Sequence, residues 1–189
     1  MESISAIIKQ AAQQKAIALD LSFQELISLP LEVTELEHLQ VLNLRRNALT
    51  ALPPELARLT HLKELNLGRN QLNEIPPVVF ELTSLESLLV YGNSLVEISA
   101  KVGRLKNLRG LNFWDNQISV LPPEIGDLTQ LMTLNLEHNQ LTELPQEITR
   151  LTRLVGLYLK GNRLPLSSDL LAFEEEPEKI LSYLFKKTA

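Results

Sequence analysis

The chain has 189 residues, 44% of them hydrophobic and 22% charged, with no cysteine and a formal net charge of −5. That length suits a single domain with a substantial core, while the lack of cysteine excludes disulfides, cysteine-ligated zinc and a thiol nucleophile. The acidic balance argues against a general nucleic-acid binder, and the absence of a long apolar stretch or a secretory signal pattern predicts a cytoplasmic chain without a membrane span.

The first predicted element is a helix over residues 3–13. Its apolar residues recur at the spacing of one helix face, and Ser3 precedes them as an N-cap. The members of this face are Ile4, Ile7, Ile8, Ala11 and Ala12.

An eleven-residue pattern then recurs every 23 residues without insertion or deletion. It reads L-x-x-L-x-L-x-x-N-x-L, and six copies begin at Leu39, Leu62, Leu85, Leu108, Leu131 and Leu154. A seventh, degenerate copy begins at Ala16. A strict period of this length is typical of architectures in which each repeat buries its apolar face against its neighbours.

Each copy contains a predicted strand followed by a turn. The alternating L-x-L segment, for example Leu42 to Leu44, predicts a short strand with its leucines on the inner face. The asparagine at the ninth position falls at the turn, where its amide can satisfy backbone groups of its own and the neighbouring coil. The predicted ladder consists of Asn47, Asn70, Asn93, Asn116, Asn139 and Asn162, with Gln24 in the first copy.

A proline follows the turn in five copies, as in Leu52-Pro53. Proline fixes φ and donates no hydrogen bond, so this return segment is predicted to be extended or a short helical turn. The copy that begins at Leu85 has Ser99 and Ala100 instead. We expect a local conformational difference there.

The last predicted element is a helix after Pro177. Proline suits the first helical turn, and the acidic residues 174–176 and the basic Lys186 and Lys187 suit its two ends. Its apolar face consists of Ile180, Leu181, Leu184 and Phe185. We expect both terminal helices to cover the open ends of the stack, although an amphipathic helix can also bind a membrane or a partner.

The repeats resemble the leucine-rich repeat family, in its 23-residue bacterial and intracellular type. This resemblance implies an α/β fold, a right-handed solenoid or horseshoe with a parallel sheet on its concave face and helical caps. We therefore expect one domain over 1–189, with an N-terminal cap helix at 1–15, seven repeats at 16–166 and a C-terminal helical cap at 167–189.

The flanks resemble the borders of the leucine-rich repeat domain in bacterial Roco proteins, in which a Ras-like GTPase domain follows the repeats. The matching pieces are an amphipathic helix leading into ALDLS and the sequence PEKILSY from Pro177. The resemblance implies an alternative function, a regulatory module of a Roco-type GTPase with an intramolecular partner. The chain is then either a stand-alone repeat protein or a fragment of a longer one.

Motifs for catalysis are missing from the sequence. It contains no P-loop, no H-E-x-x-H and no G-x-S-x-G. His38 and His61 occupy one loop column and are predicted to be solvated, not to form a metal pair. We expect no enzymatic activity, no metal and no cofactor.

The outward strand positions form the surface that is free to recognise a ligand. Seven strands at about 4.8 Å spacing make an arc of roughly 30 Å, which suits a protein or peptide. Tyr91 and Trp114 are predicted to lie side by side on this face, with Leu89 nearby, where the core does not require them. Exposed Trp, Tyr and Arg dominate interface energetics, while the alternative is that the two rings merely stack on each other.

We therefore predict a non-catalytic, monomeric protein–protein interaction module, acting as a signalling scaffold or regulator through its concave face. The mixed charge of this face, where Glu64, Asp115 and Glu137 accompany the arginines, argues against nucleic acid as the partner. The predicted partner-binding residues are Tyr91, Trp114, Leu89, Arg45, Arg46, Arg69, Asp115, His138 and Tyr158.

Overall fold

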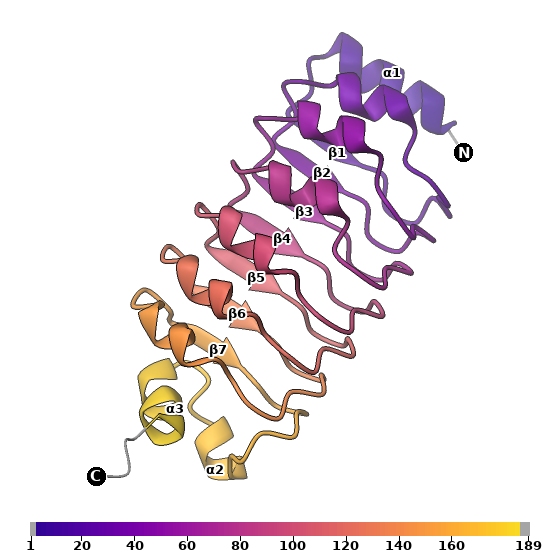
Figure 1. Ribbon diagram of the computed structural model, residues 1–189. Helices are drawn as coiled ribbons and strands as arrows, with labels where there is room; N and C mark the ends of the chain where they lie inside the picture. Colours follow the sequence, from indigo (N-terminus) through magenta and orange to yellow (C-terminus); the bar gives the residue numbers. More distant parts are fainter. Residues whose placement is uncertain (1–2, 186–189) are drawn as a thin grey trace.

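The computed structural model describes residues 3–185, which form one stack of coils (Figure 1). Each coil contributes one short strand to a single parallel sheet whose order follows the chain from β1 to β7. The strands are β1 (Ala18–Asp20), β2 (Val41–Asn43), β3 (Glu64–Asn66), β4 (Ser87–Leu89), β5 (Gly110–Asn112), β6 (Thr133–Asn135) and β7 (Gly156–Tyr158). This arrangement is a leucine-rich repeat solenoid.

The register of the sheet equals the period of the sequence. Leu42 pairs with Leu65, and Leu65 pairs with Leu88, each 23 residues further along the chain. Every strand therefore presents the same repeat position to the same place on the sheet. A column of equivalent residues in the sequence becomes a row of neighbours in space.

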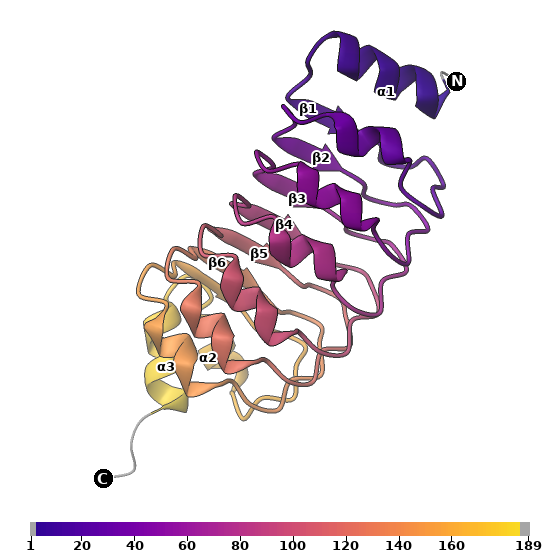
Figure 2. The same ribbon diagram turned by 45° about the horizontal axis from the view of Figure 1, so that its top comes forward.

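Short 3₁₀ helices run along the opposite side of the stack from the sheet (Figure 2). Within the described residues there are six, and each begins directly after the residue at the proline position. They are η1 (Leu31–Glu35), η2 (Pro54–Arg58), η3 (Pro77–Glu81), η4 (Ala100–Arg104), η5 (Pro123–Asp127) and η6 (Gln146–Arg150). The prediction of an extended segment leading into a short helical turn is confirmed.

The core fills the space between the sheet and the 3₁₀ helices. The inward strand leucines, such as Leu42 and Leu44, are completely buried, and so are Val90 and Phe113 where they replace leucine. Fully burying one such side chain contributes roughly 1.5–3 kcal/mol, while ordering 23 residues costs at least as much as one coil's apolar residues provide. Each coil is therefore stable only against its neighbours.

The expected conformational difference at Ser99 does not occur, and that prediction was wrong. Ser99 has φ −61° and ψ 140°, between the values of Pro76 (φ −53°, ψ 130°) and Pro122 (φ −72°, ψ 147°) in the flanking coils. Its side chain accepts a hydrogen bond from the Lys101 N–H, which begins η4 in place of proline. Packing between two regular coils imposes the same path on a copy that lacks the local proline.

Helices lie at both ends of the stack (Figure 1). At the β1 end, α1 (Ile4–Gln13) begins at Ser3, whose hydroxyl accepts a hydrogen bond from Ala6, and buries Ile8 and Ala11. At the β7 end lie α2 (Ser168–Leu171) and α3 (Pro177–Leu184), of which α3 buries Ile180. The Leu157 N–H of β7 donates to the Glu174 carbonyl at 2.8 Å, so the segment before α3 covers part of the open strand edge. The domain boundaries at 1–15, 16–166 and 167–189 stay a prediction, and Lys186 and Lys187 lie outside the described residues.

Candidate functional site

Each strand ends in a turn that positions the outward side chains beyond it. The side-chain oxygens of Asn43, Asn66, Asn112 and Asn135 accept hydrogen bonds of 2.9–3.1 Å from the backbone N–H two residues later. This is an Asx turn, which short polar side chains favour. Sequence reasoning did not assign a role to this column, although asparagine recurring two residues before the variable positions was a usable signal.

Asp20 performs the same task in the first copy and accepts a hydrogen bond of 2.8 Å from the Ser22 N–H. Partial burial acts to raise the pKa of this carboxyl, but hydrogen bonds from Ser22 and Asn43 outweigh burial and lower the pKa below its ordinary value. The ionised form therefore accepts the turn hydrogen bond at neutral pH.

The turn places the eighth position of the repeat in the left-handed backbone region. Five copies hold a residue other than glycine there, with φ between 52° and 59°, and they are Phe23, Arg46, Arg69, Asp115 and His138. Gly92 and Gly161 occupy the same place in two other copies. A left-handed residue with a side chain costs roughly 1 kcal/mol, which glycine avoids. The chain bears this cost at five positions where the side chain faces solvent.

Three rings stand in a continuous row across neighbouring coils, and we call Tyr91, Trp114 and His138 the aromatic row. The centroids of Tyr91 and Trp114 are 6.1 Å apart at 48°, and those of Trp114 and His138 are 6.3 Å apart at 88°. Both geometries fall within the range that favours ring–ring contact. Tyr91 and Trp114 are half-buried and His138 is exposed.

Glycines leave space at both ends of the aromatic row. A Cβ on Gly68 would lie 2.5 Å from the Tyr91 ring, and a Cβ on Gly161 would lie 2.8 Å from Nδ1 of His138. The rings therefore lie directly against the neighbouring backbone. Any side chain at Gly68 would displace Tyr91.

Three guanidinium groups, which we call the arginine cluster, lie beside the aromatic row. Arg45 and Arg46 both stack on the exposed ring of Phe23, at 5.8 and 5.0 Å from its centroid. The stem of Arg69 lies over Gly92, with Cγ 3.0 Å from the position of a Cβ there. Sequence reasoning selected the three arginines and missed Phe23, whose place at the outward eighth position of the first copy was the available signal.

The remaining predicted residues are less closely joined to the aromatic row. Asp115 follows Trp114 directly, and Leu89 lies in β4 between Asn66 of β3 and Asn112 of β5. Tyr158 folds over Gly156 of its own strand, where a Cβ would lie 2.9 Å from the ring. The structure thus brings Tyr91, Trp114 and His138 together and directs Tyr158 elsewhere.

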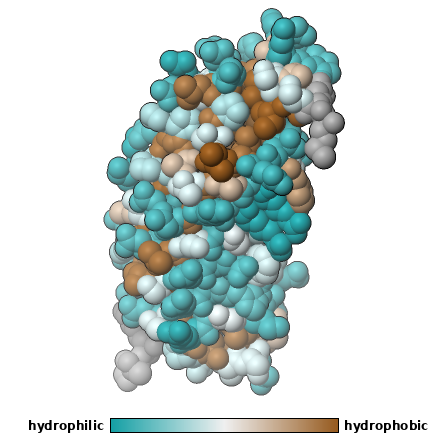
Figure 3. All heavy atoms as spheres, turned by 90° about the vertical axis from the view of Figure 1, so that its right-hand side faces the viewer, coloured by the Kyte–Doolittle hydropathy of each residue, from teal (hydrophilic) through white to brown (hydrophobic). Residues whose placement is uncertain are grey.

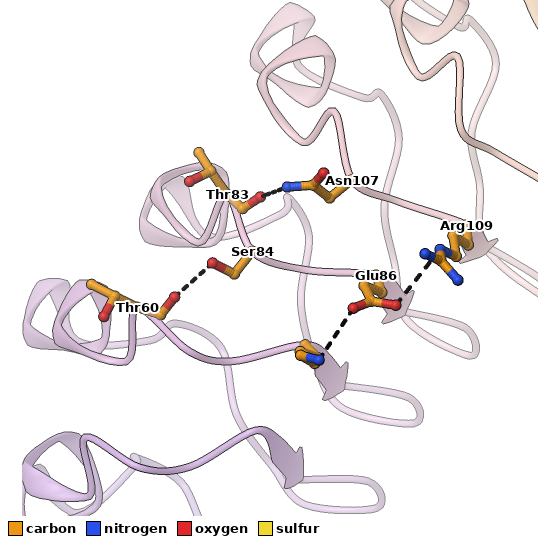
Figure 4. Close-up of polar contacts among 7 residues, drawn as sticks. Thr60, Thr83, Ser84, Glu86, Asn107 and Arg109 are labelled. Atoms are coloured by element: carbon orange, nitrogen blue, oxygen red, sulfur yellow. Dashed lines mark hydrogen bonds and ion pairs between the residues drawn. The ribbon is translucent and has the colours of Figure 1, made fainter.

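Charged residues outside this face are paired along the stack. At the column just before the strands, Glu86 lies between Lys63 at 3.5 Å and Arg109 at 3.6 Å (Figure 4). On the side of the 3₁₀ helices, Arg104 contacts Glu81 at 2.7 Å, and Asp127 lies between Lys106 and Arg150. Within residues 3–185, no ion pair involves the arginine cluster, Asp115 or Glu137.

The remaining surface carries scattered hydrophobic side chains. On the side shown in Figure 3, hydrophobic residues gather toward the end that carries α1, and the middle is mainly hydrophilic. Ile27 and Leu31 of the first copy are among the exposed hydrophobic residues. Among the described residues, no group of three or more acidic or histidine side chains is placed to hold a metal ion. No helix within 3–185 has the length and apolar character needed to cross a membrane.

Comparisons with known proteins agree with the repeat geometry. A family model described as leucine-rich repeat region matches residues 18–114 and 97–175. A search of curated proteins returned no match.

Many solved structures are similar to this chain, and two of the three described below come from plants. The plant peptide hormone receptor RGFR1 in complex with RGF2 is 34% identical, with a TM-score of 0.64 over 72% of this chain and 23% of that chain. The ectodomain of the Arabidopsis thaliana membrane receptor kinase GASSHO1/SCHENGEN3, in complex with CASPARIAN STRIP INTEGRITY FACTOR 2, is 32% identical. Its TM-score is 0.64, and the match covers 82% of this chain and 22% of that chain. The Leptospira interrogans protein LIC12759 is 30% identical, with a TM-score of 0.49, and the match covers 96% of this chain and 56% of that chain.

This chain spans less than a quarter of either plant receptor chain and just over half of the Leptospira protein. The family model nevertheless covers nearly all of the repeats, whose register and buried columns agree with it. The chain belongs to the leucine-rich repeat family.

Proposed function

We propose that this chain is a non-catalytic protein-recognition module that binds a protein or peptide on its sheet face. The observation that carries the proposal is the aromatic row, because Tyr91, Trp114 and His138 point away from a core that is complete without them. Aromatic side chains supply much of the binding energy at protein interfaces at a small entropic cost. We further propose that the module serves as a scaffold or regulator; the Roco-type alternative stays a prediction from the flanking sequences.

The dimensions of the face favour a peptide or protein over a small molecule. The hollow over β2, β3 and β4 has a volume of about 190 Å³. Small-molecule sites usually enclose roughly 300–1,000 Å³. The aromatic row extends across three coils beside this hollow and offers an open surface, not an enclosed one.

The similar structures support the same function. One is that of a peptide hormone receptor in complex with RGF2, and another is an ectodomain in complex with CASPARIAN STRIP INTEGRITY FACTOR 2. Ring–ring contact alone is a weaker explanation of the aromatic row, since a cross-strand pair contributes under about 1 kcal/mol.

A displayed library of random peptides tests the proposal. Peptides of about 12 residues, long enough to span the sheet, are selected on the full chain. We expect the selected peptides to lose at least tenfold in affinity for a Tyr91→Ala, Trp114→Ala variant, because the removed rings supply the central contacts.

Tyr183→Ala is the matched control, because Tyr183 is an exposed aromatic residue on α3. Thermal unfolding verifies that all variants are folded. Equal binding of the peptides to the double variant and to the control would reject the aromatic row as the recognition site.

A further inference from the structure

The charges of the sheet face indicate what kind of ligand it takes. Arginine–carboxylate and lysine–carboxylate pairs link neighbouring coils at the edge and on the 3₁₀ side, as in Lys63–Glu86–Arg109 (Figure 4). The arginine cluster, Asp115 and Glu137 take part in no ion pair within residues 3–185. The repeat geometry that pairs charges elsewhere leaves these side chains available to a ligand.

The arginine cluster is held in place without a carboxylate. Phe23 supports the guanidinium groups of Arg45 and Arg46, and the backbone at Gly92 supports the stem of Arg69. Nε of Arg45 is shielded from solvent and has no hydrogen-bond partner among residues 3–185. A shielded donor without an acceptor is unfavourable, and a shift of the Arg45 side chain toward a ligand carboxylate would satisfy it. Preorganised guanidinium groups favour carboxylates, with which they form paired hydrogen bonds.

The opposite charges lie at the other end of the aromatic row. Asp115 follows Trp114, and Glu137 precedes His138. A nucleic acid carries a negative charge at every phosphate and would be repelled there. A peptide can instead place acidic and basic residues at separate points along its length.

We propose that the sheet face binds an acidic peptide segment in one direction, and this inference rests on the proposed function above. The Asp or Glu residues of the peptide contact the arginine cluster, an apolar or aromatic residue covers Tyr91 and Trp114, and a Lys or Arg contacts Asp115 and Glu137. Coils are about 4.8 Å apart, so the arginine cluster is roughly 12 Å from the centre of the aromatic row. An extended peptide covers that distance in about four residues.

The same displayed library tests this inference through the composition of the selected peptides. We expect enrichment of Asp and Glu about four residues from an apolar residue, with a basic residue on its far side. The tightest peptide should bind an Arg46→Glu, Arg69→Glu variant at least tenfold more weakly, because charge-assisted hydrogen bonds are replaced by repulsion. A peptide whose acidic residues are changed to Lys should recover affinity for that variant.

Arg58→Glu, Arg163→Glu is the matched control, since it changes the net charge equally at exposed positions outside the sheet face. It should change peptide affinity by less than about twofold, because exposed charges beyond a Debye length are screened. An Asp115→Lys, Glu137→Lys variant tests the direction in which the peptide lies on the sheet face. It should weaken the binding of only those peptides that carry the basic residue.

The possible outcomes separate this inference from the proposed function. In one outcome, the selected peptides need Tyr91 and Trp114 but show no acidic enrichment, and they bind the Arg46→Glu, Arg69→Glu variant normally. This result would reject the acidic ligand but not the recognition site. Peptides that ignore Tyr91 and Trp114 would overturn both. If a fluorescent single-stranded oligothymidylate displaces the peptides at physiological salt, the proposal of a peptide ligand is rejected in favour of nucleic acid.

Discussion

Single asparagines hold consecutive coils together. Nδ2 of Asn116 donates to the carbonyls of Phe113 in its own coil and Val90 in the preceding coil, at 3.0 and 3.1 Å. Its Oδ1 accepts from the Leu95 N–H at 3.0 Å. Asn116 is buried, so water cannot replace these bonds. Gln24, which stands in this column in the first copy, instead donates to the Ser22 carbonyl within its own turn.

Replacing Asn116 with alanine should lower the free energy of unfolding by about 2–4 kcal/mol, because it orphans buried backbone groups in two coils. Urea unfolding measures the change. The matched control is Asn107→Ala, which removes one exposed hydrogen bond of 2.9 Å to the Thr83 carbonyl (Figure 4) and should cost under about 1 kcal/mol. Equal losses in the two variants would mean that burial of the ladder is unimportant.

Among the elements, the 3₁₀ helices show how stacking overrides local sequence. Five coils approach their 3₁₀ helix through proline, and Ser99 replaces it before η4. The dihedral angles nevertheless match those of the proline copies. Contacts with the coils on each side supply the restraint that the residue itself lacks. The position is therefore suited to proline although the sequence does not use it.

Ser99→Pro should raise the free energy of unfolding by about 0.4–1 kcal/mol, because the native φ of −61° already suits proline and the unfolded chain loses freedom. Thermal and urea unfolding measure the gain. Ser99→Ala serves as the control, since it removes only the hydrogen bond from Lys101 and should be slightly destabilising. A destabilised Ser99→Pro variant would show that the backbone at η4 differs from its proline counterparts.

The whole molecule is a one-dimensional stack in which each coil depends on its two neighbours. The apolar core is continuous from Ile8 of α1 to Ile180 of α3. The register of 23 residues is shared by every adjacent pair of strands. Stability should therefore depend on the number of coils and on an intact register more than on any single coil.

Deleting the 23 residues 85–107 should leave a folded, less stable solenoid, because coils on both sides of the deletion remain complementary. Circular dichroism and urea unfolding measure structure and stability. The variant also lacks Tyr91 and should lose the selected peptides. Deleting 85–108, one residue more, shifts the apolar columns out of register and should abolish cooperative unfolding. Similar behaviour of the two deletions would refute the dependence on register.

Repetition explains how much of this protein was predictable from its residues. A 23-residue period with inward leucines implies equivalent neighbours, so the strands, the buried columns, the asparagine ladder and the adjacency of Tyr91 and Trp114 follow from the pattern. Each depends on geometry that recurs identically in every coil. The family assignment rests on the same pattern.

Contacts between particular side chains required the folded structure. The support of Arg45 and Arg46 by Phe23, the fit of Tyr91 over Gly68 and the pairing of Lys63 with Glu86 all join residues about one repeat apart, and the conformation of Ser99 matches that of the proline copies on either side. Their geometry depends on rotamers and on the few ångströms between coils, which a periodic pattern leaves open. Side chains that differ from copy to copy are the ones available for recognition, and only packing in three dimensions determines which of them meet.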